Sequence, residues 1–447
     1  MADLQIQSIP YSEDSSLLMA RLLDLPFPIF LDSCNHNPQG GRYDFLTASP
    51  LATLEIENGV FTCSEPLPAG KSGDVFATAQ QLLQRHSPES SGRSQVKVPF
   101  DGGLLGFLGY PRLTGPGRIA AEQGFLGVYP WVLVVDHLER RSRLIWQPNC
   151  PQETRHAVLK RLQCNEEIAI NFELISDFSK DLSEQQYSQS FQRISDYIEA
   201  GDCYQVNLTQ RFSSRFDGHP FAAYRRLRRT TGKPFSSYFG WRDQALLCLS
   251  PERFIQVENQ HVTTQPIKGT RPRSAVPAED QRLAAELVGS EKDRAENLMI
   301  VDLLRNDLGT VCQPGSIQAT RLFELQRFDN VFHLVSTICG MLPEDLSPLE
   351  LFRNCYPGGS VTGAPKVRAM EIIEELEAHR REVYCGNVFY LGFNGCMDSN
   401  ITIRSLYCRQ QNIFCWAGGG IVADSTCEQE YRECFDKINS LINSLQG

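Results

Sequence analysis

A lysine stands at the end of a strand-like run, where its amine could act as a nucleophile. The stretch "QPIKGTRPR" (265–273) places Lys268 after alternating residues and directly before a glycine–threonine pair. Most lysines of a folded protein are solvated surface charges, whereas a lysine that loses its proton can attack an electrophilic carbon. The local sequence leaves both interpretations open, so the choice depends on the residues that the rest of the chain offers.

Isolated carboxylates on two predicted helices could bind a metal ion. Glu296 lies in the first turns of a helix predicted over 291–309. Glu430 and Glu433 share one face of the last predicted helix, and Lys437 follows one turn later. Mg²⁺ takes one or two protein carboxylates, keeps several waters and leaves positions for oxygens of a substrate. Solvated helical glutamates have the same spacing, so a magnesium site and an ordinary helix surface both remain open at this point.

Two glycine-rich segments leave backbone N–H groups that could bind an anion. The segment "YPGGSVTGAPK" (356–366) runs into a predicted helix start, where anions are favoured, and "WAGGGIVADS" (416–425) is predicted to be a loop after a strand. Neither matches a Walker A loop, because no Gly-Lys-Ser/Thr follows the glycines. Strands are predicted over 383–393 and 401–406. Arg404, on the second of these, could hold a carboxylate or form an ordinary ion pair.

The elements that position these residues fall into two regions. The first, 1–170, is predicted to be rich in strands joined by turns, with helices over 73–86 and 151–165. The second, 183–447, alternates long helices with strands and is predicted to be one large unit. The whole chain is therefore predicted to be an α+β protein.

The second region carries clear boundary signals. Its first helix is predicted to start at Ser183, which forms a capping box with Gln186. The stretch "CYQVNLTQRF" (203–212) is predicted to be a half-buried strand with a polar second face. A helix over 364–380 is predicted to carry Pro365 in its first turn.

The composition excludes several classes of function. A net charge of −10 argues against nucleic-acid binding, which shows as a basic excess. The 15 cysteines have irregular spacing and no CxxC motif, which argues against zinc sites and a disulfide framework and indicates free thiols. The longest apolar runs fall well short of the roughly 20 residues that span a membrane, and the N-terminus has no secretory signal. We therefore expect a cytoplasmic protein that binds neither nucleic acid nor membrane.

The order of these motifs resembles that of the chorismate-utilising enzymes. This family includes the large components of anthranilate synthase and aminodeoxychorismate synthase, and the isochorismate and salicylate synthases. The matching segments occur in order over 183–447 and are "CYQVNLTQRF", "SPERF", "PIKGTRPR", "DRAENLMIVDLLRNDLG", "FHLVST", "PGGSVTGAPKVRAMEII", "ITIRS" and "AGGGIVADS" with the following "EQEYRECFDK". The first region matches loosely, chiefly at "FLDS" (30–33). The resemblance implies large antiparallel β-sheets packed in an αββα sandwich with flanking helices.

The resemblance also implies roles for single residues. Glu296 and Glu433, with Glu430 beside them, match the ligands of a Mg²⁺ ion that holds the ring carboxylate of chorismate. Glu252 matches the general acid that protonates the departing C4 hydroxyl. The substrate-binding positions implied are Arg404 and Tyr390 for the second carboxylate, backbone N–H groups of Gly418, Gly419 and Gly420, His333 beside the ring, and Gln205, Ser360 and Lys437.

Two positions separate the branches of the family. Isochorismate and salicylate synthases carry a lysine base where this chain has Gln205, which can orient a nucleophile but cannot deprotonate water. Anthranilate synthases have alanine where this chain has Lys268, and a lysine there is typical of the aminodeoxychorismate branch. The resemblance therefore implies amination of chorismate at C4 through a covalent Lys268 adduct at C2, with Glu252 as the acid. The nearest alternative is an anthranilate synthase large component, against which Lys268 argues.

Two further partners are implied. Asp32 and Ser33 in "FLDS" match the family strand that contacts L-tryptophan, which could regulate the protein or fill its core. A non-catalytic tryptophan-binding regulatory subunit is a second alternative, against which the set of acid, nucleophile and metal ligands argues. No cysteine lies in the glycine-flanked elbow that a triad-type glutaminase needs. We therefore expect a separate glutaminase subunit to supply ammonia.

Overall fold

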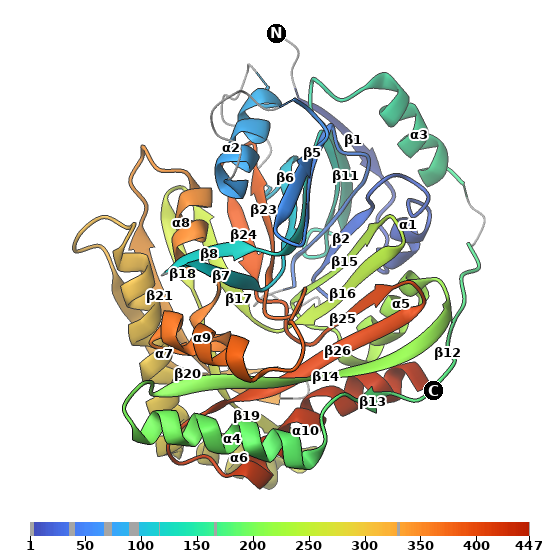
Figure 1. Cartoon of the computed structure of the whole chain (residues 1–447). Coiled ribbons are helices and arrows are strands. Elements are labelled where there is room, and N and C mark those ends of the chain that lie inside the picture. Colours follow the sequence, from blue (N-terminus) through green and yellow to red (C-terminus); the bar gives the residue numbers. More distant parts are fainter. Residues whose placement is uncertain are drawn as a thin grey trace.

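Two large antiparallel β-sheets form the framework of the protein (Figure 1). The structure, a computed structural model, describes residues 4–34, 41–66, 74–88, 98–115, 117–164, 168–328 and 331–446. The larger sheet has the strand order β1 (Gln5–Ile9), β11 (Arg141–Trp146), β10 (Trp131–Asp136), β3 (Tyr43–Thr47), β2 (Ile29–Asp32), β15 (Phe235–Trp241), β16 (Gln244–Ser250), β25 (Ser405–Arg409), β26 (Asn412–Ile421), β14 (Gln205–Gly218) and β12 (Phe172–Leu174). Two short strands also pair with β14, namely β13 (Ser179–Lys180) and β22 (Gly363–Ala364).

The smaller sheet is also antiparallel. Its order is β19 (Ile267–Pro272), β21 (Val331–Met341), β18 (His261–Thr264), β17 (Arg253–Glu258), β24 (Met397–Asn400), β23 (Asn387–Gly392), β6 (Gly103–Leu108), β9 (Gln123–Tyr129), β4 (Ala52–Glu57) and β5 (Val60–Cys63), with β20 (Gln318–Arg327) paired to β21. The strands β7 (Pro111–Gly115) and β8 (Arg118–Ala121) form a separate pair. Both sheets contain strands from the predicted regions 1–170 and 183–447, since β2 pairs with β15 and β6 pairs with β23.

Helices pack against the outer faces of the sheets (Figure 1). They are α1 (Ser16–Ala20), α2 (Val75–Arg85), α3 (Gln152–Leu162), α4 (Glu184–Glu199), α5 (Pro220–Thr231), α6 (Pro277–Gly289), α7 (Glu291–Gly309), α8 (Pro348–Cys355), the 3₁₀ turn η1 (Gly359–Val361), α9 (Lys366–Leu376) and α10 (Cys427–Gln446). One buried cluster joins Trp416 of β26 to Phe107 of β6 and so lies between the sheets. A second joins Val206 of β14 to Ile438 of α10 on the outer face of the larger sheet. The predicted α+β sandwich is confirmed.

Helix α7, which carries Glu296, and helix α4 begin as the sequence indicates. Helix α7 spans the predicted residues, and Ser290 caps it by accepting a hydrogen bond from Asp293 N. At α4, Gln186 N donates to the Ser183 hydroxyl at 3.2 Å and Ser183 N donates to Gln186 Oε1 at 2.9 Å, which confirms the capping box. No helix of the described residues is long and apolar enough to cross a membrane.

Three local predictions are wrong. The strand predicted as half-buried, β14, is buried on both faces near its start, because α9 and the segments beside it cover its polar face; Asn207 Nδ2 donates to Val361 O, for example. Helix α9 begins at Lys366 and ends at Leu376, so Pro365 precedes the helix as its N-cap. Residues 401–404 form a bend, with Arg404 in the left-handed region at φ +54, and β25 begins only at Ser405.

Candidate active site

An irregularity in β19 carries Lys268. The pairing of β19 with β21 changes register between Ile267 and Thr270. Gly269 adopts φ +84 within this step, a left-handed conformation that favours glycine. Bulges of this kind re-aim side chains and are frequent beside active sites. The position of Lys268 therefore differs from that of a residue in a regular strand.

Three carboxylates from three elements lie near the charge of Lys268, which is partly buried. Glu252 lies between β16 and β17, Glu296 on α7 and Glu433 on α10. Burial acts to raise the pKa of all three carboxyls, and the positive charge of Lys268 acts to lower each pKa. The amine of Lys268 is therefore set among acidic groups, unlike a solvated surface lysine.

The carboxyl of Glu252 is buried and titrates near neutral pH. It accepts a hydrogen bond from the Ser360 hydroxyl at 2.8 Å. Its backbone N donates to the Ser250 hydroxyl, and its carbonyl accepts from Ile401 N at 3.1 Å. Burial raises the pKa of Glu252 to about 7, against the opposing Ser360 hydrogen bond and the charge of Lys268. A carboxyl that is partly protonated at neutral pH can donate a proton to a leaving group.

Glu430 and Glu433 lie next to a glycine of β26. A Cβ atom on Gly419 would come within 2.6 Å of Glu430 Oε2, which is too close, and 3.5 Å of Glu433 Oε1, so glycine leaves room for the Glu430 carboxylate in its present position. The Ser425 hydroxyl donates to Glu430 Oε1 at 2.7 Å, and Lys437 Nζ lies 2.5 Å from Glu433 Oε1. Both carboxylates are thus held in place by polar neighbours on or before α10.

Glu433 lies near enough to Glu296 and to Glu430 to repel both carboxylates. Burial raises the pKa of Glu296 and of Glu430, and the charge of Glu433 adds to both increases. Burial also opposes ionisation of Glu433, but the ion pair with Lys437, together with the charges of Lys268 and Lys292, outweighs burial and lowers the pKa of Glu433. Within the described residues, no three His, Cys, Asp or Glu side chains form a compact metal cage. The set fits Mg²⁺, which binds through one or two carboxylates and completes its coordination with water and substrate.

His333 of β21 is neutral at neutral pH. Its Nδ1 lies 3.0 Å from the Thr270 hydroxyl on the neighbouring strand. Burial, together with the positive charges of Lys233 and Arg404, lowers the pKa of His333 to about 4. A hydrogen bond to the backbone of Gly269 acts in the opposite direction, but the imidazole remains neutral. This fits the predicted place of His333 beside a substrate ring, which stays a prediction.

Arg404 reaches this group from its bend between β24 and β25. Burial lowers the pKa of Arg404, while Tyr384 and Glu433 act in the opposite direction, so both side chains lie near the guanidinium. Its Nη1 donates to the backbone carbonyl of Lys437 on α10. A buried guanidinium next to the carboxylates of α10 is suited to bind an anionic group of a ligand.

Tyr384, rather than the predicted Tyr390, lies near the guanidinium of Arg404, and the binding role of either tyrosine stays a prediction. Tyr390 lies in the middle of β23, and its ring packs 5.1 Å from that of Phe100 in the core. Tyr384 lies in the irregular segment before β23. The strand predicted over 383–393 begins four residues too early, so the sequence treats the two tyrosines as positions of one strand. Proximity to the charge of Arg404 separates the two tyrosines, and this proximity is a property of the folded chain rather than of the local sequence.

Gln205 faces β26 with an unpaired amide. Its side chain is fully buried, and neither Oε1 nor Nε2 hydrogen-bonds to a described residue. A Cβ atom on Gly420 would come within 2.8 Å of Nε2. Such an amide offers two N–H donors and a carbonyl acceptor to a ligand or a water. The predicted loop with Gly418, Gly419 and Gly420 belongs to β26, and its glycines let β14 and α10 approach closely.

The two predicted tryptophan-binding residues have partners within the protein. Asp32 accepts hydrogen bonds from Arg228 Nε at 2.6 Å and from the Tyr224 hydroxyl at 3.0 Å. The Ser33 hydroxyl donates to Asp44 Oδ1 at 2.7 Å, which leaves its oxygen able to accept a bond. Residues 35–40, which follow this strand, lie outside the described residues. The tryptophan site stays a prediction.

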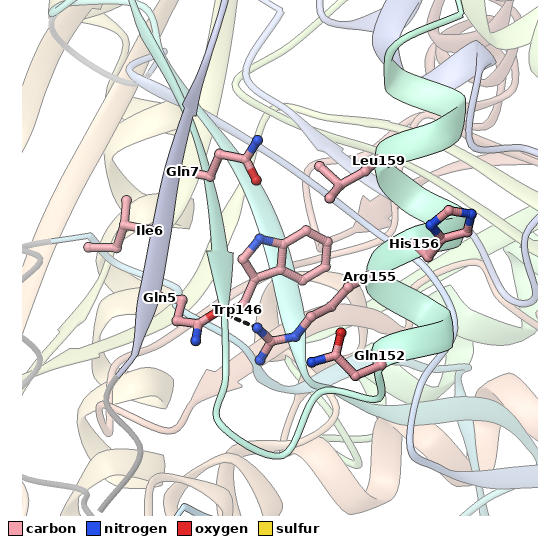
Figure 2. A pocket seen from close by; sticks show the side chains of 8 residues that line it. All are labelled: Gln5, Ile6, Gln7, Trp146, Gln152, Arg155, His156 and Leu159. Carbon is pink, nitrogen blue, oxygen red and sulfur yellow. Dashed lines mark hydrogen bonds between the residues drawn. The ribbon is translucent and has the colours of Figure 1, made fainter.

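An open pocket of about 630 Å³ lies at a distant edge of the larger sheet, between β1, β11 and α3. Figure 2 shows Arg155 of α3 reaching over the Trp146 ring, 5.7 Å from its centroid, to donate to the side-chain oxygen of Gln5. The residues that line this pocket include none of the predicted site residues. It is therefore separate from the group around Lys268.

Known proteins resemble the chain over nearly its whole length. It is 42% identical to aminodeoxychorismate synthase component 1 of Escherichia coli (strain K12), over 96% of this chain and 95% of that protein. It is 35% identical to anthranilate synthase component 1 of Thermus thermophilus, over 94% and 92% of the two chains. Among solved structures, anthranilate synthase component I from Streptococcus pneumoniae matches with a TM-score of 0.76 and 30% identity, covering 91% of this chain and 93% of that one.

A more distant structure supports the fold alone. The menaquinone-specific isochorismate synthase MenF of Escherichia coli matches with a TM-score of 0.75 at 18% identity, over 100% of this chain and 95% of that one. Residues 36–443 match the sequence profile of the chorismate binding enzyme family, a span that includes every residue placed around Lys268. The chain belongs to the chorismate binding enzymes.

Proposed function

We propose that the chain is the large component of an aminodeoxychorismate synthase, which converts chorismate and ammonia to 4-amino-4-deoxychorismate for para-aminobenzoate synthesis. The observation that carries this proposal is the placement of Lys268 among Glu252, Glu296 and Glu433. The names of the relatives that are 40–42% identical support the same activity.

Two displacements replace one difficult step. The amine of Lys268, after it gives up its proton, adds at C2 of chorismate, the ring double bonds shift, and Glu252 protonates the C4 hydroxyl, which leaves as water. Ammonia then adds at C4, the double bonds shift back, and the amine of Lys268 leaves from C2. Nucleophilic catalysis of this kind divides a hard reaction into two accessible ones. The pKa of about 7 for Glu252 suits a proton donor at neutral pH.

The helical carboxylates would hold Mg²⁺. Glu296 and Glu433, with Glu430 beside them, are the residues proposed to bind it, and the ion when bound would neutralise a carboxylate of the substrate. Arg404 and Tyr384 are proposed to hold the second carboxylate, and Gln205 and His333 to contact the ring. Lys437 acts by fixing Glu433, with which it forms an ion pair.

Product analysis tests the proposal. The pure chain is incubated with chorismate, Mg²⁺ and ammonium, and the products are identified by mass spectrometry. Aminodeoxychorismate that retains its enolpyruvyl group is the expected product. Anthranilate with pyruvate would instead show the anthranilate synthase reaction. Absence of turnover by the pure chain, despite bound tryptophan, would favour the regulatory subunit.

A separate glutaminase is proposed to supply the ammonia. No cysteine of the sequence lies in a glycine-flanked elbow, and the relatives are named as component 1, which supports a second component. The pure chain should therefore use ammonium but not glutamine. Equal rates with the two nitrogen sources would contradict the need for a partner.

A further inference from the structure

A buried ion pair lies directly behind the candidate active site. Arg381 and Glu377 follow helix α9, and their side chains are 1% and 5% exposed. Arg381 Nε donates to Glu377 Oε2 at 2.9 Å and Nη2 donates to Oε1 at 2.7 Å, a two-point pairing. A buried pair is a poor source of stability, because desolvation opposes its attraction. Its presence therefore calls for another explanation.

The pair connects two segments that are far apart in the sequence. Arg381 Nη1 donates to Val361 O at 2.7 Å, at the end of η1, and Nη2 donates to Asn207 O of β14 at 2.6 Å. Glu377 Oε1 accepts from both the backbone N and the hydroxyl of Thr209, each at 2.8 Å. One guanidinium and one carboxylate thus fix the η1 turn against β14.

Both segments continue directly into the active site. Ser360 precedes Val361 within η1, and its hydroxyl donates to Glu252 Oε1 at 2.8 Å. On the other segment, Asn207 follows Gln205 by two residues and faces the same side of β14. Val361, which Arg381 contacts, is therefore adjacent to Ser360, the hydrogen-bond partner of Glu252. Asn207, which Arg381 also contacts, lies two residues from Gln205 and its unpaired amide.

We propose that Arg381 and Glu377 are positioning residues, which hold the Ser360 hydroxyl against Glu252 and thereby set the geometry and acidity of the proton donor. This inference rests on the proposed function. It concerns residues that touch neither substrate nor metal and act through the η1 turn.

The proposal predicts a change in acidity with a definite sign. The Ser360 hydroxyl stabilises the ionised form of Glu252, so loss of this bond raises the pKa of Glu252. The other groups that face Glu252 are Lys268 on β19, Lys437 on α10 and the Cys385 thiol. The Cys385 thiol also lies near Arg381 and Glu377, whose charges act on its pKa in opposite directions, so the double variant removes both influences together. The alkaline limb of kcat/KM, where Glu252 loses its proton, should therefore move to higher pH.

The test compares two charge-neutral double variants. Arg381→Gln with Glu377→Gln removes both charges and leaves no isolated buried ion. The matched control is Lys366→Gln with Asp307→Asn, which removes a second partly buried pair, 2.6 Å apart, at the other end of α9. Chorismate consumption is measured from pH 6 to 9 in the wild type, in both double variants, in Ser360→Ala, and in each double variant combined with Ser360→Ala.

The Arg381/Glu377 variant should lose roughly ten- to a hundredfold in kcat, with a smaller change in KM for chorismate. Its alkaline limb should shift upward, as in Ser360→Ala, and adding Ser360→Ala should change little more, because both act on one contact. The control should keep the limb of the wild type. If the double variant does not fold, Arg381→Lys keeps the charge but not the two-point geometry and takes its place.

The proposal would be overturned if a folded Arg381/Glu377 variant kept the alkaline limb of the kcat/KM profile at the wild-type pH. It would also be overturned if the loss in kcat of this variant multiplied with that of Ser360→Ala when the two changes were combined. These outcomes differ from failure of the proposed function. If the wild type consumed chorismate without forming aminodeoxychorismate, the proposed product would be wrong. The comparison of the alkaline limbs of the pH profiles would still report on the acidity of Glu252.

Discussion

Replacing Gly419 by alanine should weaken the proposed metal site without unfolding the protein. The added Cβ atom would lie 2.6 Å from Glu430 Oε2, well inside contact distance, and 3.5 Å from Glu433 Oε1, which is ordinary contact. The overlap therefore falls on Glu430. Because the obstructing atom is the free end of a side chain, the protein can relieve the overlap by moving this carboxylate.

Moving the Glu430 carboxylate has a free-energy cost. Glu430 is 5% exposed and tied by its other oxygen to the Ser425 hydroxyl, so a shift breaks a buried hydrogen bond. Overpacking of this kind costs about 1–3 kcal/mol. If the displacement is expressed as lost affinity for Mg²⁺, the half-saturating concentration should rise roughly five- to 150-fold. The melting temperature should change by only a few degrees.

Chorismate consumption is titrated with Mg²⁺ at saturating ammonium for the wild type, Gly419→Ala and Gly289→Ala. Gly289 is the matched control, because a Cβ atom there meets nothing within 4 Å. Its variant should keep the Mg²⁺ dependence of the wild type. A Gly419→Ala protein with an unchanged titration would refute the assignment of Glu430 to the metal site. An unfolded variant would show that the strain is not relieved at this side chain.

Three further outcomes follow from the same geometry. In the wild type, kcat/KM should fall as pH rises through about 7, since burial raises the pKa of Glu252 to that value and the acid must be protonated; Glu252→Gln should lower the rate by about 10²–10⁴-fold and remove this limb. Lys268→Ala should lose aminodeoxychorismate formation, and an undiminished rate would exclude the covalent step. Titration with tryptophan should inhibit turnover if Ser33 forms a regulatory site; binding seen by calorimetry without inhibition would indicate a structural role.

The sequence predicts best the elements whose signals are local. Helix α7 has a capping serine and an uninterrupted helical pattern, and its range is predicted correctly. The capping box at Ser183 is likewise a property of four consecutive residues. The helical placement of Glu296 and Glu433 depends on such signals alone, and it is correct.

The errors occur where distant contacts override local pattern. Asn207 and Thr209 resemble the solvent face of a strand, yet Arg381 and Glu377 cover them. Arg404 follows alternating isoleucines, but it lies in a left-handed bend. The choice between the two tyrosines depends in turn on where β23 begins. Asn207 and Thr209 are covered by partners more than 160 residues away, and Arg404 is held by Lys437, 33 residues away, so none of these positions follows from a local pattern.

The location of the site explains how one fold can serve several reactions. Lys268 lies on β19, the terminal strand of the smaller sheet, while Gln205 begins β14, near one end of the larger sheet. Neither residue belongs to the buried apolar clusters that join the sheets and helices. In the proposed mechanism, substitution at either position changes the nucleophile or its orientation and removes no apolar side chain from these clusters. On this argument, Lys268→Ala should melt within a few degrees of the wild type, and a large loss of stability would mean that the lysine also supports the fold.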